Sequence, residues 1–161
     1  YNFFYNPAYI NDFKNWLIVE KDTNANASFG FVSSMMNFNM GLFFNRDGGL
    51  GNTGANSANL RPIDLMIGGD AGVKWGLGIQ YAAASNPTAG AAIDDSSELN
   101  VRLGASFSGL DPFASYRVIG KDELAGTDVN EYSGYGVGLR YHFGEWTPYA
   151  HYGMAEREGK G

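Results

Sequence analysis

The chain has 161 residues, a net charge of −6 and no cysteine. This length corresponds to one domain, and a negative charge without any Lys/Arg cluster argues against nucleic acid as a partner. The absence of cysteine excludes disulfides and thiolate zinc sites. A mean hydropathy of −0.25 and the lack of any run of about 20 apolar residues exclude membrane-spanning helices, so only strands could cross a membrane.

Nine segments alternate large apolar residues with small or polar ones, which is the pattern of β-strands. The segment EYSGYGVGLRYHF is an example, because Val137 and Leu139 fall on one face while glycines and Arg140 fall on the other. We expect strands at residues 15–21, 28–34, 36–45, 63–69, 73–83, 98–107, 112–119, 131–143 and 147–156.

The connections between these strands alternate in length. Residues 70–72 and 108–111 form short turns, whereas residues 46–61, 84–97 and 120–130 are long and rich in glycine and polar residues. One end with tight turns and one with long loops is typical of outer-membrane barrels. The sequence therefore predicts an all-β, antiparallel, up-and-down transmembrane β-barrel in a bacterial outer membrane.

The composition of the two faces indicates which one meets lipid. The apolar face carries almost no charge, and the aromatic residues Tyr81, Phe107, Phe143 and Trp146 lie toward strand ends, where Tyr and Trp favour the membrane interface. We expect this face to contact lipid and the polar face to line the barrel interior. A soluble lipocalin-like barrel, whose apolar face would surround a ligand, is the alternative.

Charged side chains recur on the expected inner face. A charge inside a barrel must be hydrated or paired, so these residues line a wet passage or form a network that fills the interior. The luminal candidates are Lys74, Arg102, Arg117, Arg140 and His142, with Asp64 and Glu131 as counterions.

Catalytic and metal-binding motifs are missing from the sequence. The two histidines, His142 and His151, fall on neighbouring strands and could approach each other. No GxSxG motif, HExxH motif or third metal ligand accompanies them. We expect neither an enzyme nor a metal or cofactor site.

The segment FFYNPAYI at residues 3–10 carries a family resemblance. Asn6, Pro7 and Ala8, with aromatic residues before them, resemble the aromatic-x-Asn-Pro-Ala segment near the mature N-terminus of the FadL-like long-chain fatty-acid transporter superfamily, which includes PorV-like barrels. The resemblance implies an N-terminal segment inside a barrel of about fourteen strands, and a conduit for small hydrophobic molecules. A simple Asn-Pro turn is the alternative for these residues.

The predicted organisation is a single β-barrel domain over residues 1–161, with an N-terminal segment at 1–13 and a strand meander at 14–157. Single-chain bacterial barrels normally have an even number of strands, so about nine strands predict an incomplete barrel. A full eight-stranded barrel is the alternative if residues 15–21 do not span the membrane. The expected partners are the lipid bilayer, lipopolysaccharide and a small hydrophobic molecule. A structural or interaction barrel that docks a protein partner in an outer-membrane assembly is the alternative function.

Overall fold

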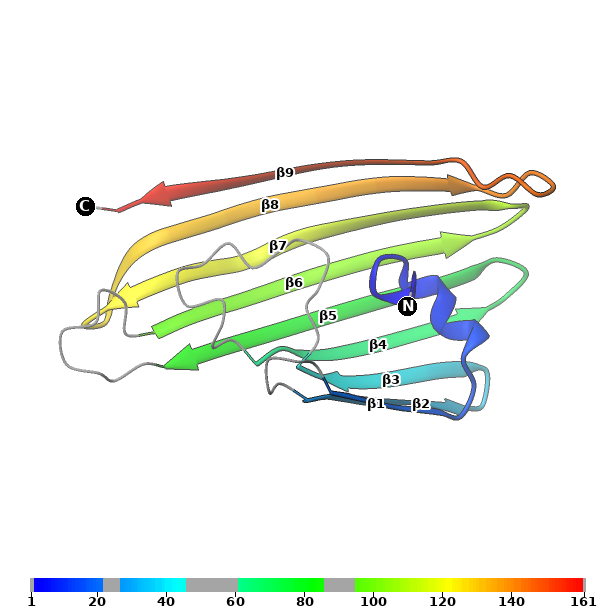
Figure 1. Ribbon diagram of the computed structural model, residues 1–161, viewed down its shortest axis with the longest axis horizontal. Coiled ribbons are helices and arrows are strands. Elements are labelled where there is room, and N and C mark those ends of the chain that lie inside the picture. The colour runs from blue at the N-terminus through cyan, green and yellow to red at the C-terminus, as the bar shows by residue number, and fades with distance from the viewer. Residues whose placement is uncertain (1, 22–26, 46–60, 86–94, 161) are drawn as a thin grey trace.

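The computed structural model describes residues 2–21, 27–45, 61–85 and 95–160. Nine strands form one antiparallel sheet in which each strand pairs with its neighbours in sequence (Figure 1). The predicted all-β, up-and-down meander is thus confirmed. The strands are β1 (Trp16–Lys21), β2 (Ala27–Met35), β3 (Phe38–Phe44), β4 (Ile63–Asp70), β5 (Lys74–Ser85), β6 (Asp95–Ser106), β7 (Leu110–Leu124), β8 (Thr127–Tyr141) and β9 (Tyr149–Gly159).

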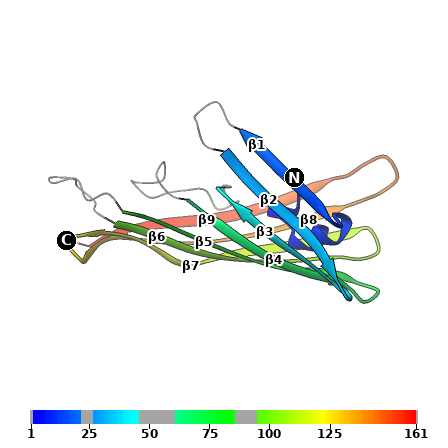
Figure 2. The ribbon, with the colours of Figure 1, turned by 90° about the horizontal axis from the view of Figure 1, so that it is seen from below.

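The sheet is curved and open (Figure 2). The first and last strands, β1 and β9, each pair with one neighbour and not with each other. Both edges therefore present backbone N–H and C=O groups that a further strand could use.

The N-terminal segment packs on one face of this sheet. It consists of two short 3-10 helices, η1 (Asn2–Phe4) and η2 (Pro7–Asp12), and η2 contacts β3 to β6. Within the described residues, no helix has the length and apolar character needed to span a membrane.

The face that carries the N-terminal segment, here called the inner face, has two different halves. On the side of β1 to β4, apolar residues from the strands pack against the aromatic rings of the N-terminal segment. This core consists of Phe3, Phe4, Ile10, Ile18, Val32, Phe43 and Met66. From Asp64 of β4 onward the inner face is mostly polar, as the sequence predicts for the whole of it. The apolar half was not predicted.

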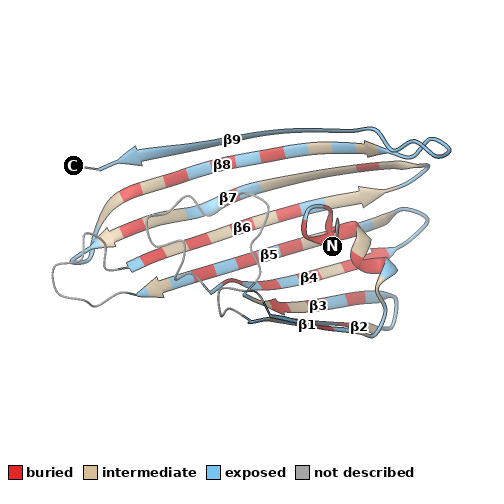
Figure 3. Cartoon of the chain, viewed as in Figure 1, coloured by how far each residue is buried: buried red, intermediate tan, exposed pale blue. Residues whose placement is uncertain are grey.

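Burial alternates along the central strands (Figure 3). The inner residue Arg102 is only 2% exposed, whereas the outer residues Val137 and Leu139 are 47% and 44% exposed. Successive side chains of a strand point to opposite faces, so this alternation separates a polar, buried face from an apolar, exposed one. The edge strand β9 is exposed on both faces.

The prediction of a long loop at residues 120–130 is wrong. Strand β7 continues to Leu124 and β8 begins at Thr127, so Ala125 and Gly126 alone form the turn. The polar residues that suggested a loop include Asp122 and Asn130, which are buried on the inner face. A polar lumen-type face and a loop have similar compositions, which explains the error. The other two predicted long loops lie mostly outside the described residues.

The Ala125-Gly126 turn provides a stability prediction. Both residues have positive φ, 51° and 78°, as a two-residue hairpin turn requires, and Asn-Gly is the preferred sequence there. Ala125→Asn should raise the free energy of unfolding by about 0.5–1 kcal/mol, because alanine is strained in this region and asparagine tolerates it. Urea unfolding of both proteins measures the difference, and a loss of stability would contradict the turn geometry.

Candidate functional site

The Asn-Pro-Ala motif begins helix η2. The Asn6 side-chain oxygen accepts a hydrogen bond from the Ala8 N–H at 3.0 Å, and Pro7 occupies the first helical position. Asparagine at the N-cap and proline at N1 are both favoured at helix starts. The motif is therefore a capped helix start and not a simple turn.

Two inner-face glycines make room for this motif. A Cβ atom at Gly76 would overlap the Pro7 carbonyl and lie 2.5 Å from the Ala8 nitrogen. At Gly104 it would lie 2.8 Å from the Asn6 Cγ. The glycines that alternate with apolar residues in β5 and β6 thus seat the N-terminal segment directly on the sheet backbone.

Buried asparagines attach the segment to the strands. The Asn6 amide donates to the Ala105 carbonyl at 3.1 Å. The Asn11 amide donates to the Gly69 and Trp75 carbonyls at 3.2 and 3.0 Å. Hydrogen bonds of this kind satisfy polar groups that would otherwise be buried at a cost, so they fix the position of the segment.

Arg102 connects the segment to the polar network of the inner face. Its guanidinium forms an ion pair with Asp64 and donates to the Phe4 carbonyl at 2.8 Å. Asp64 also accepts from the Gln80 amide at 3.0 Å. All three side chains are buried, and a buried charge is tolerated when it is paired in this way.

The network continues across β5, β6 and β7. The Asn100 amide donates to Gln80 at 3.1 Å and to Glu98 at 2.7 Å. Arg117 forms an ion pair with Glu98 at 2.8 Å. A continuous series of hydrogen bonds and ion pairs therefore runs from β4 to β7.

A second cluster surrounds Asp122, near the β7–β8 turn at Ala125 and Gly126. Its carboxylate accepts hydrogen bonds from the Ser96 hydroxyl at 2.6 Å, the Tyr132 hydroxyl at 2.5 Å and the Asn130 amide at 3.2 Å. Arg157 of β9 donates to Asn130 at 3.0 Å. Strands β6 to β9 are therefore joined by polar side chains as well as by their backbones.

A third cluster lies at the opposite end of the sheet, near the β6–β7 turn. The Tyr9 hydroxyl donates to Asp111 at 2.5 Å, and His142 Nε2 lies 2.6 Å from the same carboxylate oxygen. Burial of the phenol, together with the hydrogen bond and negative charge of Asp111, raises the pKa of Tyr9 to about 12. Asp111 thus connects η2 to the β7 and β8 strands.

Removal of this hydrogen bond should weaken the attachment of η2. Tyr9→Phe is expected to lower the free energy of unfolding by about 1.5–3 kcal/mol, because the lost bond ends on a charged group. A raised pKa favours the neutral phenol in the folded state. The part of the stability that depends on this shift is therefore complete below pH 10 and is lost as the pH rises toward 12. Tyrosine absorbance titration of the variant should lose one transition near pH 12, and an unchanged titration would contradict the assignment.

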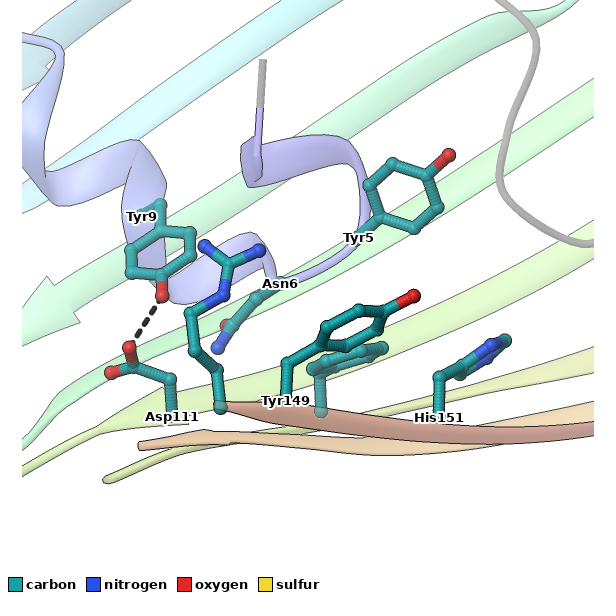
Figure 4. Close-up of a pocket in the computed structure, with 8 residues that line it drawn as sticks. Tyr5, Asn6, Tyr9, Asp111, Tyr149 and His151 are labelled. Carbon is teal, nitrogen blue, oxygen red and sulfur yellow. Dashed lines mark hydrogen bonds between the residues drawn. The ribbon is translucent and has the colours of Figure 1, made fainter. Parts of the chain in front are cut away.

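A pocket of about 470 Å³ opens beside this cluster, between the N-terminal segment and β7 to β9 (Figure 4). Tyr5 reaches it from the N-terminal segment, and Tyr149 and His151 reach it from β9. Arg140 lies with its guanidinium carbon 5.9 Å from the centre of the Tyr9 ring. Ligand pockets commonly have this size and combine apolar walls with a few polar groups.

The predicted luminal residues fall into three places. Arg102 and Arg117 are in the buried network, and Arg140 and His142 are near Asp111. Lys74 is apart from both, at the rim of the sheet, where it pairs with Asp12 of η2.

Two expectations about partners are wrong. Glu131 is not a counterion of the inner arginines, because it alternates with the buried Asn130 and Tyr132 onto the outer face and pairs with Lys160. The two histidines are not paired with each other. His142 contacts Asp111 and Thr147, while the His151 ring stacks on another aromatic ring.

Sequence reasoning missed Tyr9 and Asp111. Asp111 was placed in a turn, although its spacing of two from Phe113 already puts it in phase with the inner face of β7. No pattern in the sequence indicated Tyr9. It belongs to helix η2, and the position of η2 on the sheet depends on contacts between residues that are far apart in the sequence.

Comparison with known proteins found no matching family model, no similar curated protein and no similar solved structure. The FadL-like resemblance of residues 3–10 stays a prediction. In the part of the chain that the structure describes, no three His, Asp or Glu side chains converge as metal ligands. The fold defines the chain only as an open, antiparallel, all-β meander whose inner face has an apolar half and a polar half.

Proposed function

We propose that the nine strands are part of the wall of a bacterial outer-membrane β-barrel, and that this barrel is a conduit for small hydrophobic molecules. One observation carries the proposal. Figure 3 shows that burial alternates along the strands; the buried strand residues are mostly polar and the exposed ones are mostly apolar, which is the reverse of a soluble barrel and is characteristic of a barrel in lipid. The lipocalin-like alternative requires the opposite arrangement.

The outer face of β8 supports this orientation in detail. From its C-terminal end toward the β7–β8 turn, it presents Tyr141, Leu139, Val137 and Tyr135, followed by Ser133. An aliphatic centre between tyrosines is expected where a strand crosses from one membrane interface to the other. These four residues extend over about 20 Å at ~3.4 Å per residue, a large part of the apolar band of ~25 Å in such barrels.

Beyond this band the outer face becomes charged. Lys121 pairs with Glu123, Glu131 pairs with Lys160, and Ser133 lies opposite Glu156. Charges at this level fit a barrel wall that extends past the membrane on the side of the β7–β8 turn.

The two open edges fit a wall and not a finished barrel. Unpaired strand edges do not occur in the hydrocarbon region, because lipid offers no hydrogen-bond partners. In the proposed barrel β1 and β9 are therefore each paired with another strand. The N-terminal segment lies in the interior, fixed against β3 to β6, and leaves the pocket on the side of β7 to β9.

Support for a conduit comes from this pocket and from the FadL-like resemblance of residues 3–10. The pocket lies between the fixed segment and the wall, and Tyr5, Phe113 and Tyr149 give it aromatic surface. A hydrophobic molecule could contact these rings inside an otherwise polar barrel.

Spin labels test the orientation of the wall. Single cysteines at Val137 and Leu139 should show high oxygen accessibility in lipid vesicles, because oxygen concentrates in the bilayer. A cysteine at Gly136, which is buried on the inner face of the same strand, is the matched control and should show low accessibility. The reverse pattern would refute a lipid-facing outer surface.

The conduit itself needs a separate assay. Vesicles with a lipopolysaccharide outer leaflet resist apolar dyes, so entry of a naphthylamine dye should be faster when the folded protein is present. Vesicles that contain heat-unfolded protein are the control. Equal rates with a correct spin-label pattern would leave the wall in place and reject the conduit.

A further inference from the structure

The pocket in Figure 4 contains a cation without a carboxylate partner. The Arg140 guanidinium lies against the Tyr9 ring, and no ion pair joins it to an acidic residue in the part of the chain that the structure describes. Arginine pairs strongly with carboxylates through two parallel hydrogen bonds. Arg140 is therefore able to bind an anionic ligand.

Asp111 is opposite Arg140 in the β7–β8 register, but its carboxylate already has two other partners. Its carboxylate accepts the Tyr9 hydroxyl at 2.5 Å and lies 2.6 Å from His142 Nε2. These contacts turn the carboxylate toward η2 and the β8–β9 connection. Asp111 also lines the pocket, so the Arg140 guanidinium is the positively charged group of the pocket that has no ion pair among the described residues.

The walls of the pocket favour a flat ligand. The Phe113 and His151 rings stack with centres 5.8 Å apart and planes 19° apart. Tyr5 and Tyr149 reach the pocket from opposite sides (Figure 4). None of the residues that line it is Leu, Ile, Val or Met. Planar rings stack on such walls, whereas a flexible acyl chain would find no aliphatic surface.

We propose that this pocket binds an aromatic carboxylate, with the carboxylate on Arg140 and the ring between Tyr5 and Tyr149. The proposal rests on the proposed function, since it takes the inner face as the interior of a barrel and names the class of molecule that the interior recognises. The pocket volume of about 470 Å³ accommodates a bicyclic acid.

Calorimetric titration of the full chain in detergent with naphthoate tests the class. Decanoate carries the same charge on a linear chain, and naphthylmethanol carries the same rings without charge. Naphthoate should bind about tenfold tighter than either compound, or more. Equal binding of decanoate would overturn the requirement for a ring, equal binding of the alcohol would overturn the role of charge, and no binding of naphthoate would overturn the site.

Two variants locate the binding. Arg140→Gln should weaken naphthoate binding about tenfold or more, while Lys14→Gln removes one positive charge from an exposed lysine outside the pocket and should leave binding unchanged. If Arg140→Gln binds naphthoate as tightly as the unmodified chain does, the proposal is overturned. If Arg140→Gln does not fold, Tyr149→Leu replaces it, because Tyr149 is 70% exposed on the edge strand. Unchanged naphthoate binding by Tyr149→Leu would also overturn the proposal.

The spin-label pattern separates the two possible failures. A lipid-facing Val137 together with absent naphthoate binding rejects the ligand class alone. A buried Val137 rejects the barrel and, with it, the interior location of the pocket.

Discussion

Gly76→Ala is expected to lower the free energy of unfolding by about 3 kcal/mol and to displace the N-terminal segment from the sheet. The new Cβ atom would meet the backbone of Pro7 and Ala8, which cannot rotate away as the end of a side chain can. Overpacking of a tight site costs about 1–3 kcal/mol, and backbone overlap belongs at the upper end of that range. Urea unfolding measures the stability, and proteolysis near residue 13 reports displacement of the segment.

Gly78→Ala is the matched control for this effect. Gly78 lies two residues farther along the same strand and on the same face, but its new Cβ atom would lie 3.4 Å from the nearest neighbouring atom, Arg102 Nε, which is ordinary contact. Its effect should be below about 1 kcal/mol, because no atom has to move. Equal losses in the two variants would mean that the N-terminal segment is not seated on Gly76.

Val137→Arg should lower the free energy of unfolding in lipid vesicles by about 2–4 kcal/mol, the cost of an arginine near the membrane midplane on the lipid-facing side of a barrel. Val137 is 47% exposed, so the same change at a site in contact with water would cost little. The size of the loss in stability therefore shows whether Val137 is surrounded by lipid or by water. Urea titration in vesicles gives the difference directly.

Ser133→Arg is the matched control for the medium. Ser133 is on the same face of β8, four residues closer to the β7–β8 turn, and lies opposite Glu156. An arginine there should be neutral or slightly favourable, because it can pair with that carboxylate in water. If Val137→Arg is as mild as Ser133→Arg, the outer face of β8 does not contact lipid at Val137.

Gly138 on the inner face tolerates substitution less well than sequence alternation suggests. Sequence alternation alone suggests that Gly138→Ser is harmless, since Gly138 faces the same side as Arg140. A Cβ atom there would lie 2.6 Å from ring atoms of Phe113, so serine requires that ring to move. Gly138 is therefore a packing position and is not suitable as a tolerant control.

The strands could be predicted from sequence because alternation is a local property. All nine predicted strands overlap observed ones, and the polar character of Gln80, Asn100 and Arg102 already indicated the inner face of β5 and β6. The pairing of Arg102 with Asp64 was also predictable, since both residues are in phase with that face. Alternation therefore defines both the strands and the faces.

The seat of the N-terminal segment could not be predicted in this way. Which glycines receive Pro7 and Ala8 depends on how a non-adjacent segment lies across β5 and β6, and no periodic pattern records that placement. The cluster around Asp111 has the same origin, because it joins η2 to residues about a hundred positions later. The β-bulge in β7, where Leu99 pairs with Ile119 but Asn100 pairs with Arg117, likewise interrupts the alternation that sequence reasoning relies on.

The most direct test of the central claim is the state of the unmodified chain with and without a cover for its apolar face. Circular dichroism and size-exclusion chromatography should show an intact sheet and a monodisperse particle in detergent or lipid. Transfer to plain buffer should cause aggregation or loss of the sheet, because Leu65, Val137 and Leu139 would then face water together with the rest of the outer face. A chain that stays monodisperse in plain buffer with its sheet intact would contradict the membrane-barrel account.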